Sequence, residues 1–246
     1  MRETLGELNP KQNLSSDTLF HFTASLEVLV KILRKGFQVR YIYEKLPQIR
    51  LAYFVETVCF CDIPLGAIKN HLNWYGNYGI GINRKKAKEK GFSPVIYIHQ
   101  KSPHIVVSGT DKNIKDLSNS PTTKYLKQIR GKQLFYNKEK DNKPYWRWKT
   151  FYEEREWRYF PETIQAINVE KYKKETDLDS RRNKLNATNS LSSLKIDNDW
   201  IEYIIVDKKI EIPKIISIIK KLFKSNSLAE ILISKILTSE QIAKDF

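Results

Sequence analysis

The fold class of this chain follows from the stretch Thr18-Leu-Phe-His-Phe-Thr23 and from the segment directly after it. Aromatic and β-branched residues dominate 18–23, which predicts a β-strand. Ser25 then provides an N-cap for a helix whose Leu29 and Leu33 lie on one face, and Gly36 ends that helix. The chain thus passes from a strand directly into an amphipathic helix.

Working outward, the same reasoning predicts more strands and helices that do not alternate regularly, which indicates an α+β fold with a mixed or antiparallel sheet and flanking helices. Residues 171–198 are polar and rich in Ser and Asn, which predicts a loop. We expect a single domain, 1–246, with core motifs in 18–160 and a C-terminal βα segment in 200–246. The further strands are expected at 55–61, 78–82, 94–99, 151–160 and 201–206, and the further helices after Pro64, Asn83, Pro213 and Thr238.

The composition indicates a globular protein. Of 246 residues, 41% are hydrophobic and 29% are charged, so the chain can bury a substantial core. Apolar runs stay well below the ~18 residues that a membrane-spanning helix needs. Residues 1–10 carry two acidic side chains and no apolar run, unlike a secretory signal. We therefore expect a cytoplasmic protein without a membrane partner.

The charge is strongly positive, with 43 Lys and Arg against 28 Asp and Glu. Such a field attracts polyanions, although a Lys-rich composition alone gives the same excess. The insertion 101–150 holds twelve Lys or Arg against four acids, together with Tyr145, Trp146 and Trp148. Basic residues interleaved with aromatic ones are typical of single-stranded nucleic-acid grooves. The alternative is a solvated basic insertion whose aromatic residues pack on the core.

Metal and disulfide chemistry are not expected. Cys59 and Cys61 are the only cysteines, and two residues of separation in a strand would strain a disulfide. The four histidines lack the spacing of a zinc module, so we predict two structural thiols and no metal. The phosphate-binding loop, the dinucleotide fingerprint and the nucleophile elbow are absent from the sequence.

Polar residues inside predicted strands are the candidates for chemistry. Glu154 and Glu156, two apart in Phe151–Phe160, should project from one face of a strand. Burial and mutual repulsion should raise their pKa values, as in sites that meet a developing positive charge. The alternative is an exposed salt-bridge lattice. His21, between two phenylalanines, is either a core histidine or a site residue.

Four ordered motifs are similar to those of the abortive-infection AbiGi family: Leu19-Phe-His-Phe-Thr23 with its helix, Val58-Cys-Phe-Cys-Asp-Ile-Pro64, Tyr75-Gly-Asn-Tyr-Gly-Ile-Gly81 and Glu154-Arg-Glu-Trp-Arg158. The resemblance spans residues 18 to about 160. It implies a role in phage defence, on the antitoxin side of a two-gene pair, and hence a partner toxin.

A more distant resemblance is to the ADP-ribosyltransferase fold, which has a first-strand histidine and a late E-x-E strand. It implies NAD as a substrate, with His21 orienting the nicotinamide ribose and Glu156 gripping its 2′-hydroxyl beside Glu154. The S-T-S triplet of that fold is missing, and Phe60-Cys61-Asp62 stands in its place. The remaining residues expected at the NAD site are Phe22, Thr23, Tyr75 or Tyr78 on nicotinamide, and Arg155 or Arg158 on the pyrophosphate.

Three hypotheses follow for the function. The first is a phage-defence protein with an ADP-ribosyltransferase-like domain that uses NAD to modify a nucleic acid or an acidic protein. The second is a non-enzymatic antitoxin or regulator that binds nucleic acid or a partner toxin through its basic surface. The third is a cleft that senses a nucleotide without turnover.

Overall fold

The computed structural model describes residues 15–46, 51–99, 101–102, 122–136, 144–162, 166–169, 175–188 and 192–245. The helices are α1 (Leu26–Lys35), α2 (Lys69–Tyr75), α3 (Arg84–Glu89), α5 (Glu175–Thr188), α6 (Ile212–Leu222), α7 (Asn226–Ser234) and α8 (Ser239–Asp245). Short 3₁₀ turns are η3 (Leu65–Ala67), η4 (Thr123–Tyr125), η5 (Phe151–Glu154), η6 (Asn198–Trp200) and η7 (Lys209–Glu211). In these ranges no helix is both long and apolar enough to cross a membrane.

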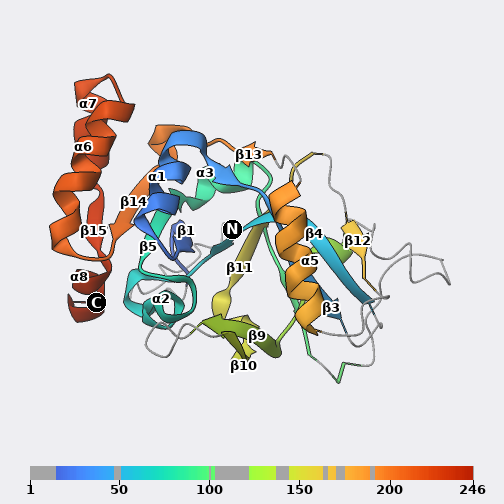
Figure 1. Ribbon diagram of the computed structural model, residues 1–246. Coiled ribbons are helices and arrows are strands. Elements are labelled where there is room, and N and C mark those ends of the chain that lie inside the picture. The colour runs from blue at the N-terminus through green and yellow to red at the C-terminus, as the bar shows by residue number, and fades with distance from the viewer. Residues whose placement is uncertain are drawn as a thin grey trace, which may run out of the picture.

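The strands are β1 (Thr18–Thr23), β2 (Phe37–Gln38), β3 (Arg40–Leu46), β4 (Leu51–Cys61), β5 (Tyr78–Asn83), β6 (Ser93–Pro94), β7 (Ile96–Ile98), β8 (Leu126–Gln128), β9 (Arg130–Tyr136), β10 (Pro144–Thr150), β11 (Glu156–Tyr159), β12 (Ala166–Asn168), β13 (Ser193–Leu194), β14 (Ile201–Val206) and β15 (Ile236–Thr238). The main sheet has the order β15-β14-β5-β1-β4-β11-β6, and β3 and β12 also pair with β4 (Figure 1). The β14–β15 pair is parallel and the other pairs of this sheet are antiparallel. The α+β class and the mixed sheet are therefore confirmed.

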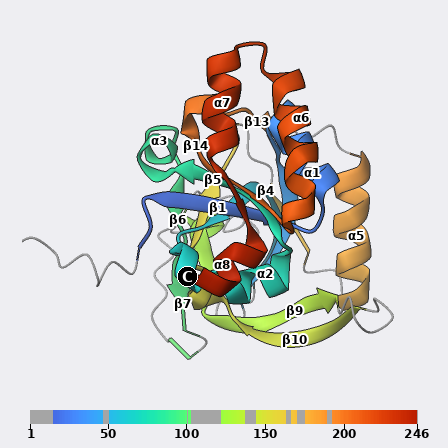
Figure 2. The same cartoon turned by 90° about the vertical axis from the view of Figure 1, so that its left-hand side faces the viewer.

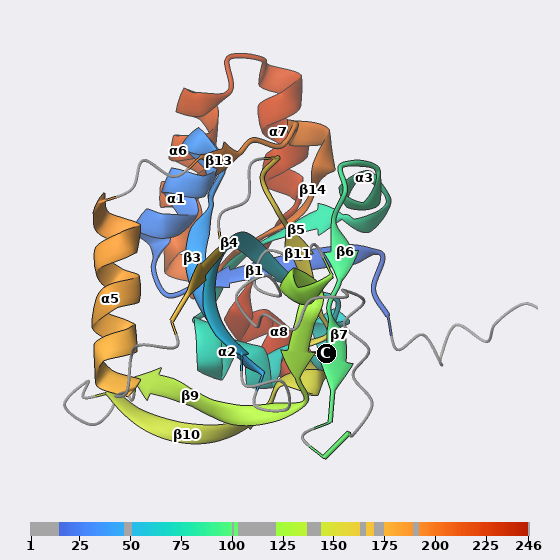
Figure 3. The ribbon, with the colours of Figure 1, turned by 90° about the vertical axis from the view of Figure 1, so that its right-hand side faces the viewer.

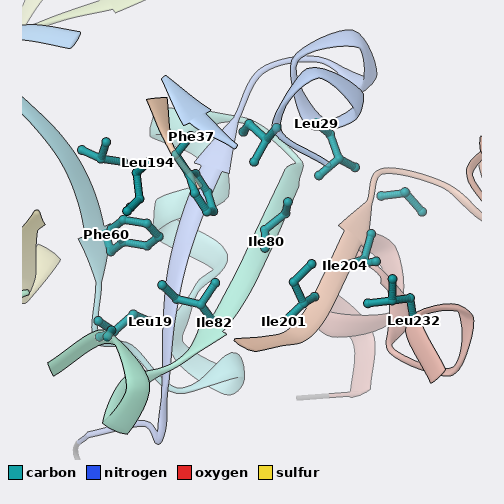
Figure 4. Packing of buried hydrophobic residues seen from close by; sticks show 14 of the residues in the cluster. Leu19, Leu29, Phe37, Phe60, Ile80, Ile82, Leu194, Ile201, Ile204 and Leu232 are labelled. Carbon is teal, nitrogen blue, oxygen red and sulfur yellow. The ribbon is translucent and has the colours of Figure 1, made fainter. Parts of the chain in front are cut away.

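Strand alternation divides the core between the two faces of the sheet. Leu19 and Ile80 project toward α1, α6 and α7, and Leu29 of α1 is fully buried against them (Figure 4). The opposite face carries Phe20 and Ile205, which pack against α2 and α8. The helix expected after Ser25 is present, with the Ser25 side chain accepting from the Val28 amide and Gly36 at its C-terminus.

The sheet opens between β1 and β4. Strand β1 pairs with β5 along its whole length, from Thr18 to Thr23, but its register with β4 consists of Phe20 opposite Cys61. Strand β3 takes up pairing with β4 at Thr57 and continues to Leu51. The β4 residues between Thr57 and Cys61 thus lie where the two halves of the sheet diverge.

The basic insertion contributes strands where the structure describes it. Strands β9 and β10 form an antiparallel hairpin, in which Trp148 lies opposite Lys132. Figures 2 and 3 show this hairpin running beneath the sheet, from the vicinity of α2 toward one end of α5. Residues 103–121 and 137–143 of the insertion lie outside the described residues. The hairpin closes the space below the open part of the sheet.

Two expectations from the sequence are wrong. The segment 151–160 is not one strand, because η5 occupies its first half and Arg155 adopts a left-handed conformation, with φ of 46°, before β11 begins. The polar segment 171–198 is not a loop throughout, because it contains the helix α5 and the strand β13. Helix α5 docks through Leu178, which is buried against Tyr41 and Phe54. Two apolar side chains, Leu178 and Leu185, make those contacts, which is too few for an amphipathic pattern to stand out in the sequence.

Candidate functional site

A cleft of about 680 Å³ occupies the space between the two halves of the sheet. This volume lies within the range of small-molecule sites, ~300–1,000 Å³. Strands β1, β3 and β4, helix α2, turn η5 and the β9–β10 hairpin all contribute walls. Of the site residues predicted from the sequence, the cleft brings together His21, Phe22, Tyr75, Glu154 and Glu156.

The two carboxylates lie together at the base of this cleft, each about 4% exposed. Both accept from the Lys127 ammonium, at 2.9 Å for Glu154 and at short range for Glu156. Lys149 holds the other oxygen of Glu154 at 2.6 Å, and Tyr75 donates its hydroxyl to that same oxygen. Glu154 lies in turn η5 and not in a strand. Arg155, which separates the two glutamates, has a left-handed backbone conformation, and both carboxylates lie on the cleft.

The fully buried Arg158 extends the network beyond the cleft. Its Nε lies 2.6 Å from Glu156, another of its nitrogens pairs with Glu44, and a third donates to the Lys124 carbonyl at 2.7 Å. Three cations therefore face three carboxylates: Lys127, Lys149 and Arg158 against Glu44, Glu154 and Glu156. The buried network has no net formal charge.

The expectation of raised carboxyl pKa values is wrong for Glu154 and Glu156, whereas burial raises the pKa of Glu44, which also lines the cleft. Burial alone would raise the pKa of Glu156, but Arg158 and Lys127 outweigh it and hold the pKa well below its usual range. Burial likewise opposes ionisation of Glu154, yet Lys127 and Lys149 lower its pKa. Both side chains remain carboxylates at neutral pH, so neither supplies a proton as a general acid.

His21 is fixed in one tautomer at the diverging strands. Its Nδ1 lies 2.8 Å from the Cys59 carbonyl oxygen, which only accepts hydrogen bonds, so Nδ1 carries the proton. Burial lowers its pKa, and the neutral ring packs edge-on against Phe37 with centroids 5.1 Å apart. The imidazole thus links β1 to β4 by a side-chain hydrogen bond, and His21 also lines the cleft.

His71 is a candidate that sequence reasoning did not single out. This α2 residue lines the cleft and is 6% exposed, and its Nε2 finds no hydrogen-bond partner among the described residues. Burial lowers its pKa to about 4, so the ring is neutral at pH 7. A buried polar atom without a partner costs stability, so such an atom in a cleft indicates a place for a ligand group.

The other predicted site residues lie elsewhere. Tyr78 donates to Glu211 at 2.7 Å and packs against the main core, so Tyr75 is the tyrosine on the cleft. Thr23 is buried in β1 away from the cleft lining. Neither Arg155, which lies 4.0 Å from Asp62, nor Arg158 lines the cleft.

Cations on the cleft wall come instead from positions distant in sequence: Lys45, Lys132 and Arg182. Trp74, Trp146 and Trp148 line the cleft as well. The thiols Cys59 and Cys61 also line it, and burial raises the pKa of both. The expectation of two buried thiols fits Cys61, whereas Cys59 is only half-buried.

Comparison with known proteins gives the family. The family model for the abortive phage resistance protein AbiGi, described as an antitoxin, matches residues 51–207. The chain belongs to the AbiGi family. The chain is also 27% identical over 224 residues to the abortive phage resistance protein AbiGi of Lactococcus lactis subsp. cremoris. This alignment covers 79% of the present chain and 90% of the Lactococcus protein.

The span shared with the AbiGi family model contains most of the cleft. It includes β4, α2, the β9–β10 hairpin and both glutamates, while His21 precedes it. No solved structure matches the chain significantly. Membership of the AbiGi family, as predicted from the four motifs, is thus confirmed.

Proposed function

We propose that this protein is the antitoxin-side component of an abortive phage-defence pair, and that its cleft binds a nucleotide of the NAD class without cleaving it. The observation that carries the ligand part is the cleft itself. Aromatic rings surround a pair of carboxylates and a histidine nitrogen that lacks a partner among the described residues. The antitoxin part rests on the description of the family.

The chemistry of the walls suits the parts of such a ligand. Phe22, Trp146 and Trp148 of the cleft lining offer aromatic surface for a planar base. The carboxylates accept hydrogen bonds from ribose hydroxyls, and the His71 Nε2 either donates to or accepts from a hydroxyl, depending on which ring nitrogen carries the proton. Lys45 and Lys132 supply positive charge for a pyrophosphate, the role expected of Arg155 or Arg158.

The ion pairs favour binding over cleavage. Breaking the nicotinamide–ribose bond develops an oxocarbenium-like cation, which an unpaired carboxylate stabilises. Both oxygens of Glu156 already face cations, Arg158 on one and Lys127 on the other. With its charge balanced in this way, Glu156 offers a ribosyl cation little net attraction.

ADP-ribosyl transfer is the second candidate, since Glu154, Glu156 and His21 all line one cleft. In that reaction the bond between ribose and nicotinamide breaks, nicotinamide leaves with the bonding electrons, and a nucleophile of the target bonds to the ribose carbon. Lys127 would have to leave Glu156 as the ribosyl cation forms. ADP-ribosyl transfer therefore requires NAD as the ligand and separation of the Lys127–Glu156 ion pair.

Calorimetric titration with NAD, combined with chromatographic detection of nicotinamide, separates the two candidates. We expect NAD binding by the native protein, weaker binding by the His71→Leu variant, and no nicotinamide release. Nicotinamide release that disappears in the Glu156→Gln variant would establish transfer instead. Absence of NAD binding by the folded native protein would refute the nucleotide proposal. Co-expression with the second protein of the pair tests the antitoxin role, which requires relief of that protein's toxicity.

A further inference from the structure

Large aromatic side chains on β10 remain exposed. Trp148 is 53% exposed, Tyr145 45% and Trp146 37%. A strand places alternate residues on one face, so Trp146 and Trp148 share a face, and both line the cleft. Clustered exposed aromatic residues at the edge of a pocket mark a binding surface more often than a core.

Positive charge accompanies these rings. The Arg130 guanidinium lies 5.2 Å from the Trp148 ring centre, and Lys132 pairs with Trp148 across the hairpin. On the neighbouring α2, the Trp74 ring receives Arg147 at 5.5 Å and Lys149 at 4.4 Å. Arg130 and Lys132 of the hairpin thus lie beside the exposed Trp148, whereas Arg147 and Lys149 lie on the opposite face of β10, toward α2.

The spacing of the two tryptophans suits a planar base. Alternate residues of a strand are ~6.8 Å apart, about twice the ~3.4 Å between stacked bases. Rings carried at this backbone spacing on one face of a strand can stack on successive unpaired bases. The same face continues into the cleft, where Lys132 and the two tryptophans form part of the lining.

We propose that the β9–β10 hairpin, residues 130–136 and 144–150, binds single-stranded nucleic acid, whose terminal nucleotide enters the cleft. The second half of this statement rests on the proposed nucleotide function, whereas the first half stands on the hairpin alone. Stacking on exposed rings requires unpaired bases, which excludes a duplex as the preferred ligand. The net charge of +15 is complementary to a polyanion.

Fluorescence anisotropy with labelled twelve-nucleotide oligothymidine and oligouridine tests the proposal. The Trp146→Ala/Trp148→Ala double variant should lose ~10-fold or more in affinity, since each stacked base contributes substantially to binding. Lys132→Glu should weaken binding and reduce its dependence on salt. The matched control is Lys220→Glu/Lys221→Glu on α6, an exposed basic pair away from the hairpin (Figure 1), which should alter affinity less than Lys132→Glu.

The tryptophans are exposed, so their replacement should leave the fold intact, which circular dichroism checks. No oligonucleotide binding by the native protein, or equal binding by the double variant, would overturn the proposal. A third outcome would also overturn the proposal: the native protein binds the second protein of the pair but no oligonucleotide, and the double variant binds neither. The hairpin would then be a protein-docking surface. Oligonucleotide binding without NAD binding would support binding of the strand by the hairpin, and would refute both the proposed nucleotide ligand and the entry of a terminal nucleotide into the cleft.

Discussion

The buried His71 makes a measurable prediction about stability and pH. Burial lowers its pKa to about 4 in the folded protein, from 6.5 for an exposed histidine. Between these values the unfolded chain binds a proton that the folded protein does not, so the stability contributed by the neutral ring is complete above pH 6.5 and falls as the pH decreases. From pH 7 to pH 5 this linkage removes about 2 kcal/mol of unfolding free energy.

The perturbation is His71→Leu, which keeps an apolar side chain of similar size and removes the titrating ring. Urea denaturation at pH 7, 6 and 5 gives the unfolding free energy of each protein. The native protein should lose about 2 kcal/mol more over this range than the variant. His21, whose pKa is also lowered, leaves a residual slope of the same sign in the variant.

Equal pH slopes for the native protein and His71→Leu would refute the reasoning, because they would mean that His71 is protonated as readily when folded as when unfolded. The window stops at pH 5 for a physical reason. Folding lowers the pKa values of Glu154 and Glu156, so their contribution is lost below the ordinary carboxyl pKa of ~4.3. Above pH 5 these two carboxylates are ionised in both states, and the comparison of the native protein with His71→Leu cancels the contributions of the groups that both proteins share.

Three further predictions concern the network and the Cys61 thiol. Lys127→Met should cost about 3–5 kcal/mol of unfolding free energy in urea denaturation, because it leaves a buried excess of negative charge, and adding Glu154→Gln should recover part of the loss. Glu156→Gln should lower the thermal midpoint, since it removes a carboxylate from between two buried cations, and an unchanged or higher midpoint would contradict the ion-pair geometry. Cys61 should react more slowly with a disulfide reagent at pH 8 in the folded protein than in urea, because burial raises its pKa, and equal rates would contradict that burial.

Much of the fold could be predicted because the spacing of apolar residues along the sequence follows which side chains are buried. The aromatic and β-branched residues around Phe20 and the helical spacing of Leu29 and Leu33 both reflect which side chains face the core, and these elements form as expected. The break at Arg155 could not be predicted, because a left-handed conformation at arginine leaves no signal in composition. Helix α5 escaped detection for a related reason, since its polar surface outweighs the few side chains that dock it.

The residues of the candidate site likewise divide into those that the sequence indicates and those that only the fold shows. Glu156 and His21 were found because a polar residue inside a strand pattern is conspicuous. Lys127 and Lys149 were not, because lysines in a basic insertion resemble solvated surface, and only the fold shows them 9% and 7% exposed beside carboxylates. His71 carried no signal, because an unpartnered ring nitrogen is a property of packing.

The distribution of charge around the cleft argues for one orientation of a bound nucleotide. At the base, the carboxylates are balanced by Lys127, Lys149 and Arg158, so a phosphate there would meet no surplus positive charge. The cations that line the cleft outside this network are Lys45, Lys132 and Arg182. If the cleft binds a nucleotide as proposed, its phosphates should lie toward Lys45 and Lys132, and its ribose should lie toward the carboxylates. A strand held this way would leave the cleft along the β9–β10 hairpin, past the exposed rings of Trp146 and Trp148.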